Sequence, residues 1–160
     1  MRWDTGRMSA LKDQLHADLT TSMKARDALR TSTLRMVLTA ITNAEVSGKQ
    51  VKELSDDDVL TVLGAEAKKR REAAAAFAEG NRPELAEKET AEAEILAEYL
   101  PEQLGADDIA AIVTAAVESA GAAGEGMKAM GRVMGIVSPQ VKGRADGGAV
   151  AAEVKRQLGA

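Results

Sequence analysis

The stretch that decides the fold runs from Gly131 to Gly148 and reads GRVMGIVSPQVKGRADGG. Apolar residues recur at helical spacing in its first part, Gly143 suits a left-handed helix stop, and Asp146 can cap a helix that follows. We therefore expect a helix, a sharp turn and a second helix. Gly131 and Gly135 would allow the first of these helices to approach another closely.

Helical signals continue through the rest of the chain. Ala, Leu, Glu, Lys and Met dominate, and no window alternates apolar and polar residues as a strand does. Further helix starts are marked by Ser9, Asp27, Ser55, Pro83 and Asp107. In the first two helices we expect these residues to face inward: Leu11, Leu15, Leu19, Met23, Leu29, Met36, Val37, Ala40, Ile41 and Ala44. The sequence therefore predicts an all-α fold.

The segment from Leu100 to Gly105, LPEQLG, interrupts the helical pattern and marks a domain boundary. We expect an N-terminal four-helix domain over residues 8–104 and a C-terminal three-helix tail domain over residues 105–160. Met8 is an alternative start to Met1, which leaves residues 1–7 as an extension that we expect to be disordered. This extension is also too short and too polar for a secretory signal.

Composition excludes several classes of protein. The 160 residues carry a net charge of −4 and no cysteine, so the chain has no disulfide or thiolate metal site, and a reducing cytoplasm is compatible. Its apolar runs are too short to span a membrane. The only aromatic residues are Trp3, Phe77 and Tyr99, too few for a protein that reads single-stranded RNA by stacking bases on several rings.

The densest basic run, Lys68-Lys69-Arg70-Arg71, has two interpretations. A nucleic-acid site is one. The other is a solvated face paired with acids, because a hairpin that folds back about Asn81 brings Glu92 level with Arg70. We favour the paired face.

Candidate catalytic and metal-binding residues are weak. The acidic series consists of Glu84, Glu87, Glu89, Glu92, Glu94 and Glu98. It lacks the Glu-x-x-His pairs of a di-metal bundle, and the single histidine, His16, has no partner at a recognisable spacing. The segment GEGMKAMG from Gly124 matches no phosphate-binding loop. We therefore expect no catalytic residue, no metal site and no cofactor.

The tail is locally basic, since Lys128, Arg132, Lys142 and Arg144 lie between Gly126 and Ala145 with no acidic residue among them. Lys128 and Arg132 are four residues apart and share a helix face. Lys142 and Arg144 precede a helix N-terminus, a position that favours phosphate. A structural alternative remains: both residues complement the negative end of the preceding helix.

Two segments near the end are the most specific to a family: Met130-Gly131-Arg132-Val133-Met134 and Lys142-Gly143-Arg144-Ala145-Asp146-Gly147. Together with Leu34-Arg35-Met36, Val59-Leu60-Thr61-Val62-Leu63 and Glu98-Tyr99-Leu100-Pro101-Glu102-Gln103-Leu104, they resemble the GatB/YqeY family, specifically its small stand-alone YqeY-like members. The resemblance implies a tail domain like that of the B subunit of the aminoacyl-tRNA amidotransferase, which contacts tRNA. It assigns structural roles to Gly131, Gly143, Asp146 and Gly147, and tRNA-backbone contacts to Lys128, Arg132, Lys142 and Arg144.

The function that this resemblance implies is a non-catalytic accessory protein that binds tRNA or other folded RNA and is linked to aminoacyl-tRNA amidation. Amidotransferase subunits or aminoacyl-tRNA synthetases are the implied protein partners. Two alternatives stay open. One is carbon–nitrogen ligase activity with glutamine as amide donor, as part of a tRNA amidotransferase. The other is a protein-interaction module that does not bind RNA, with the Met-bearing face of the tail as its contact surface.

Overall fold

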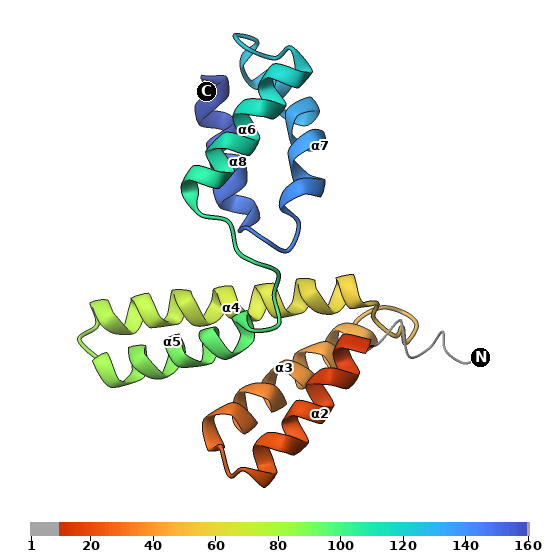
Figure 1. Cartoon of the computed structure of the whole chain (residues 1–160), viewed down its shortest axis with the longest axis vertical. Helices are drawn as coiled ribbons and strands as arrows, with labels where there is room; N and C mark the ends of the chain where they lie inside the picture. The colour runs from red at the N-terminus through yellow and green to blue at the C-terminus, as the bar shows by residue number, and fades with distance from the viewer. Residues whose placement is uncertain (1–9, 160) are drawn as a thin grey trace. The chain divides into compact units, whose positions relative to one another are not determined.

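The computed structural model describes residues 10–159, and within that range it contains seven α-helices, one short 3-10 helix and no strand (Figure 1). The expected all-α fold is therefore confirmed. Contacts within the chain divide it into two compact units, Met1–Leu100 and Pro101–Ala160. Ser9 and the expected extension over residues 1–7 lie outside the described residues. No described helix is both long and apolar enough to cross a membrane.

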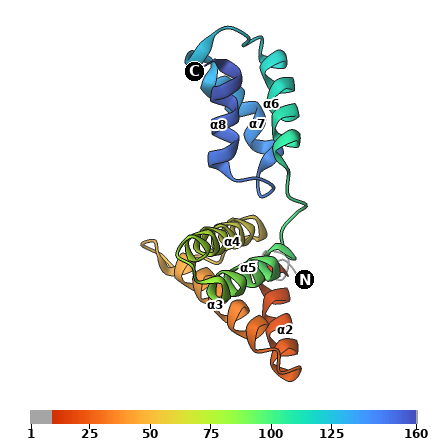
Figure 2. The same cartoon turned by 90° about the vertical axis from the view of Figure 1, so that its left-hand side faces the viewer.

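The N-terminal unit contains two helical hairpins, α2 (Ala10–Lys24) with α3 (Ala28–Val46) and α4 (Asp56–Glu79) with α5 (Pro83–Ala97). In each hairpin the two helices lie side by side (Figure 2). The expected caps of α3 and α4 are confirmed. Asp27 accepts a hydrogen bond from the backbone N–H of Arg30, and Ser55 and Asp58 form a reciprocal capping box.

The core of this unit contains the fully buried residues Leu15, Leu34, Ile41, Leu63 and Leu96. Leu34 and Leu38 were not among the expected inward positions, and the expectation for Met23 and Met36 is wrong. These two methionines are 42% and 41% exposed, and each contacts an arginine through its sulfur: Met23 with Arg35 and Met36 with Arg70.

Arg70 and Glu92 meet across the α4–α5 hairpin, as the fold-back about Asn81 predicts, with 3.6 Å between Arg70 Nε and Glu92 Oε1. The pairing is as expected, but the expectation of a solvated face is wrong at this point, because both residues are buried. Arg70 also pairs with Glu66 at 2.8 Å, while Lys69, which pairs with Glu66 at 3.2 Å, stays exposed. The basic run therefore divides between the interior and the surface of the hairpin.

The C-terminal unit contains α6 (Ala106–Ala120), the 3-10 helix η1 (Gly126–Ala129), α7 (Met130–Val141) and α8 (Gly147–Leu158). Helix α6 packs against both α7 and α8. The expected cap Asp107 is wrong, because α6 starts after Gly105, whose N–H donates to Asp108 Oδ2 at 3.0 Å. The buried core consists largely of valines at helical spacing: Val113, Val117, Val133, Val137, Val141, Val150 and Val154, with Ile109 and Leu158.

Candidate functional site

The turn between α7 and α8 is the one that the sequence predicts. Lys142 ends α7, and Gly143 has a φ of +74°, which few residues other than glycine adopt without strain. The N–H of Arg144 then donates to the carbonyl of Val141 at 2.8 Å and closes the turn. Asp146 caps α8 by accepting a hydrogen bond from the N–H of Ala149 at 3.2 Å.

Arg144 is held by the segment that leads into the C-terminal unit. Its carbonyl accepts a 2.8 Å hydrogen bond from the N–H of Leu104. Its guanidinium donates to the carbonyl of Glu102 at 3.4 Å and to the carbonyl of Gln140 at 3.5 Å. The contact with Gln140, in the last turn of α7, is the helix-end interaction that the structural alternative proposed. Arg144 therefore stabilises the turn.

Arg132 forms an ion pair with Glu125 but stays partly exposed. Its guanidinium lies 2.7 Å from Glu125 Oε2, and its side chain is 48% exposed. Glu125 lies one residue before the acid-free stretch of the sequence, so the linear pattern gave no sign of this pair. Half of the Arg132 side chain nevertheless remains accessible to a ligand in solution.

Lys128, Arg132 and Lys142 all lie on the solvent-exposed side of η1 and α7. The residues between them on this side are small and uncharged: Gly131, Gly135, Ser138 and Pro139, all of them exposed. We call these seven residues the α7 basic face. A Cβ added at Gly131 or Gly135 would meet nothing within 4 Å, so no helix in residues 10–159 makes the expected close approach at these glycines.

The N-terminus of α8 is less available to an anion than its position in the sequence suggests. The side chain of Asp146 accepts a hydrogen bond from the N–H of Ala149. The backbone carbonyl of Asp146 accepts a second hydrogen bond, from the N–H of Val150 at 3.1 Å. The Asp146 carboxylate also places a negative charge at this helix end. Lys142 is therefore the positive group of the turn that a ligand can reach.

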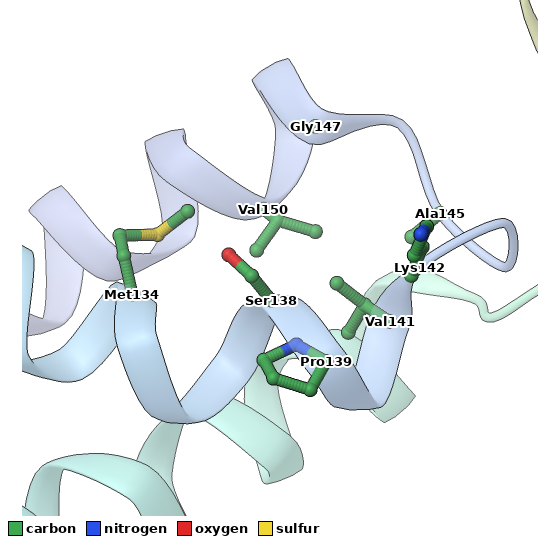
Figure 3. A pocket seen from close by; sticks show the side chains of 8 residues that line it. All are labelled: Met134, Ser138, Pro139, Val141, Lys142, Ala145, Gly147 and Val150. Atoms are coloured by element: carbon green, nitrogen blue, oxygen red, sulfur yellow. The ribbon is translucent and has the colours of Figure 1, made fainter. Parts of the chain in front are cut away.

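An apolar groove of about 540 Å³ runs between α7 and α8 (Figure 3). Its lining residues are Met134, Ser138, Pro139, Val141, Lys142, Ala145, Gly147 and Val150. The helical pattern of the sequence gives no sign of this groove, because it depends on where two helices diverge in space. Gly147 and Gly148 at the start of α8 could have indicated the groove, since two residues without side chains leave space beside the helix.

Comparison with known proteins shows the family. Residues 12–158 match the family described as Yqey-like protein. The chain belongs to the Yqey-like protein family.

Among its relatives, an uncharacterized protein of Schizosaccharomyces pombe is 39% identical over 92 residues, which are 58% of this chain and 73% of the relative. A protein of Pyrenophora tritici-repentis is 29% identical over 150 residues, 92% of this chain and 80% of the relative. A protein of Clavispora lusitaniae is 33% identical over 96 residues, 60% of this chain and 55% of the relative. The latter two are both named altered inheritance of mitochondria protein 41, mitochondrial.

In this Yqey-like chain the N-terminal unit has a polar hollow of its own, of about 620 Å³, formed by α2, the start of α3 and the end of α5. Tyr99 donates a 2.5 Å hydrogen bond to Asp18, and Arg30 forms two hydrogen bonds with Glu98 at 2.9 and 3.0 Å. Burial raises the pKa of Tyr99, and the hydrogen bond and negative charge of Asp18 raise it further. These polar groups pair with one another, and their hydrogen bonds link α2 and α3 to the end of α5.

His16 is exposed on α2. No group of three or more His, Cys, Asp or Glu residues in the described part of the chain is placed to hold a metal ion.

Proposed function

We propose that this protein is a non-catalytic accessory protein that binds tRNA, or another folded RNA, through its C-terminal unit. The observation that carries the proposal is the α7 basic face. Three cationic side chains lie along one exposed side of η1 and α7, and small residues separate them. A phosphate backbone is the ligand that such a surface suits, because cations fix its position while small residues allow it to come close.

The spacing along the helix supports this proposal. Residues 128–142 span about 20 Å at the rise of an α-helix, so one strand of RNA can contact Lys128 or Arg132 at one end and Lys142 at the other. Gly131 and Gly135 each cost helix stability, about 1 kcal/mol relative to alanine. Packing against the described residues does not explain either glycine. Close contact with a second molecule would explain both.

The expected strength of binding follows from the number of cations. Arg144 supports the turn, so the phosphate contacts that we propose are Lys128, Arg132 and Lys142, of which Arg132 also pairs with Glu125. The slope of log affinity against log salt should therefore be roughly −2 to −3 for duplex-like RNA. Binding of this kind recognises the shape of folded RNA, and the chain has few aromatic residues on which to stack bases.

The proposed link to aminoacyl-tRNA amidation rests on the resemblance of the tail to that of the amidotransferase B subunit. In this scheme the protein delivers or holds tRNA for amidotransferase subunits or for an aminoacyl-tRNA synthetase. We propose the cytoplasm as its location, although the fungal relatives quoted above carry names that describe mitochondrial proteins. Imaging the tagged full-length chain in its own cells distinguishes the two compartments.

The test is titration of labelled, folded tRNA with the full chain at several salt concentrations. We compare the native protein with the double variant Lys128→Ala, Lys142→Ala. The control is Lys155→Ala, which removes an exposed charge from α8 in the same unit and is not one of the residues of the α7 basic face. We expect the double variant to bind more weakly and to reduce the salt slope by about 2, and the control to bind normally. Absence of binding at low salt, or equal losses in both variants, would refute the proposal.

A further inference from the structure

We propose that the groove between α7 and α8 binds a single unpaired nucleobase of the RNA, whose adjoining phosphate contacts Lys142. This inference rests on the proposed function and adds a recognition element to it. The α7 basic face would position the RNA backbone, and the groove would select RNAs that present a base outside the helical stack.

The groove owes its shape to the residues at its edges. Val141 and Val150 are buried and form its floor, while α8 begins with Gly147 and Gly148 and so has no side chain at its first two positions. Met134 lies nearer the middle of α7 and forms one end of the hollow (Figure 3). The space of about 540 Å³ is large enough for one flat ring system.

The lining has the chemistry that a nucleobase requires. Most of its surface is apolar, and the thioether of Met134 can make the sulfur–aromatic contact that favours a flat ring. The Ser138 hydroxyl points toward α8 across the groove (Figure 3). A hydroxyl both donates and accepts hydrogen bonds, so it can pair with the edge of a base.

The charge of the groove favours a nucleotide over an uncharged apolar side chain of a protein. Lys142 lines the groove and belongs to the α7 basic face. Arg144 is directed to the carbonyls of Glu102 and Gln140. An occupant with a flat apolar body and an attached negative charge matches this arrangement. Residues 101–160 contain no Phe, Tyr or Trp, so in this unit an unpaired base must be held by an aliphatic surface of this kind.

The experiment uses two RNA hairpins with the same stem, one fully paired and one with a single bulged 2-aminopurine. Their affinities for the full chain are measured at one salt concentration, together with the fluorescence of the bulged base. The groove variant is Ser138→Leu, which fills the space. The matched control is Gln140→Leu, the same kind of change at an exposed position of α7 that does not line the groove.

We expect the native protein and Gln140→Leu to bind the bulged hairpin roughly five- to tenfold more tightly than the paired one, with a change in fluorescence. Ser138→Leu should bind both hairpins equally and at the affinity of the paired one. Equal affinity of the native protein for both hairpins, or an unchanged preference in Ser138→Leu, would overturn the inference and leave the proposed function intact. Failure of both hairpins to bind at low salt would refute the proposed function itself.

Discussion

The N–H of Leu104 donates a 2.8 Å hydrogen bond to the carbonyl of Arg144, although the two residues are far apart in the sequence. This bond joins the segment that enters the C-terminal unit to the turn between α7 and α8. Gln103 adds a second connection, since its side-chain amide donates to the carbonyl of Gly143 at 3.0 Å. Two neighbouring residues of the entering segment therefore hold the basic turn, and of its two cations Arg144 adds hydrogen bonds to backbone carbonyls.

Replacement of Arg144 should affect stability more than RNA binding. Arg144→Ala removes two long hydrogen bonds to the carbonyls of Glu102 and Gln140, and we expect a loss of about 1 kcal/mol in the free energy of unfolding. Urea unfolding measures this loss. Lys128→Ala, a change at an exposed lysine of the α7 basic face, should unfold like the native protein and bind tRNA more weakly. A stable Arg144→Ala variant with reduced tRNA affinity would instead place Arg144 in the RNA contact.

Two glycine substitutions should have opposite effects on stability. Gly135→Ala lies in a regular helix with open space around the new Cβ, so it should stabilise α7 by up to about 1 kcal/mol. Gly143→Ala must adopt a φ of +74° and should destabilise the protein by about 1 kcal/mol.

Thermal unfolding checks both directions. If RNA approaches the α7 backbone, Gly135→Ala should also bind tRNA more weakly despite its greater stability. Normal tRNA affinity in this variant would contradict the close approach at the α7 basic face.

Tyr99 should ionise only at a pH above the ordinary pKa of tyrosine. Burial, followed by the hydrogen bond and charge of Asp18, raises the pKa of Tyr99 above its ordinary value of about 10. Because the folded-state pKa is the higher one, the resulting stabilisation is present below pH 10 and is lost as pH rises through the folded-state pKa.

Tyr99 is the only tyrosine, so the near-ultraviolet absorbance of tyrosinate reports it directly. Asp18→Asn should lower this pKa, whereas Asp13→Asn, an exposed change on the same helix, should not. Ionisation near pH 10 in the folded native protein would contradict the role of Asp18.

Glu92 should make the protein less stable as pH rises through the weakly acidic range. Desolvation raises the pKa of Glu92, and the neighbouring Glu89 raises it further, while Lys88 and Arg70 oppose the shift. The folded state therefore binds the proton more tightly than the unfolded state, and this contribution to stability is lost as pH rises through the folded-state pKa.

The comparison that isolates this effect is urea unfolding of the native protein and Glu92→Gln at several pH values. We expect the stability of the native protein relative to Glu92→Gln to fall with rising pH. Glu94→Gln, at an exposed position on the same helix, is the control. An unchanged difference across the acidic range would show that Glu92 does not titrate in the folded state.

Local residue choices were enough to predict the helices and their ends. Ser55 with Asp58, Asp27, Gly143 and Asp146 occupy the caps and stops that their side chains or backbone preferences favour, because these interactions reach only three or four residues along the chain. One error concerned a local interaction. Asp107 was expected to cap α6, but the neighbouring Asp108 bonds to the N–H of Gly105 instead.

By itself, the sequence determined the all-α class, the basic character of the tail and its glycine-rich turn. Only the tertiary structure decided what each basic residue does. Arg70 is buried against Glu92, Arg132 meets Glu125, and Arg144 bonds to backbone carbonyls, whereas Lys142 lies beside the groove. The physical reason is range: helix propensity and capping act between near neighbours, while burial, ion pairing and grooves depend on which side chains meet when helices pack.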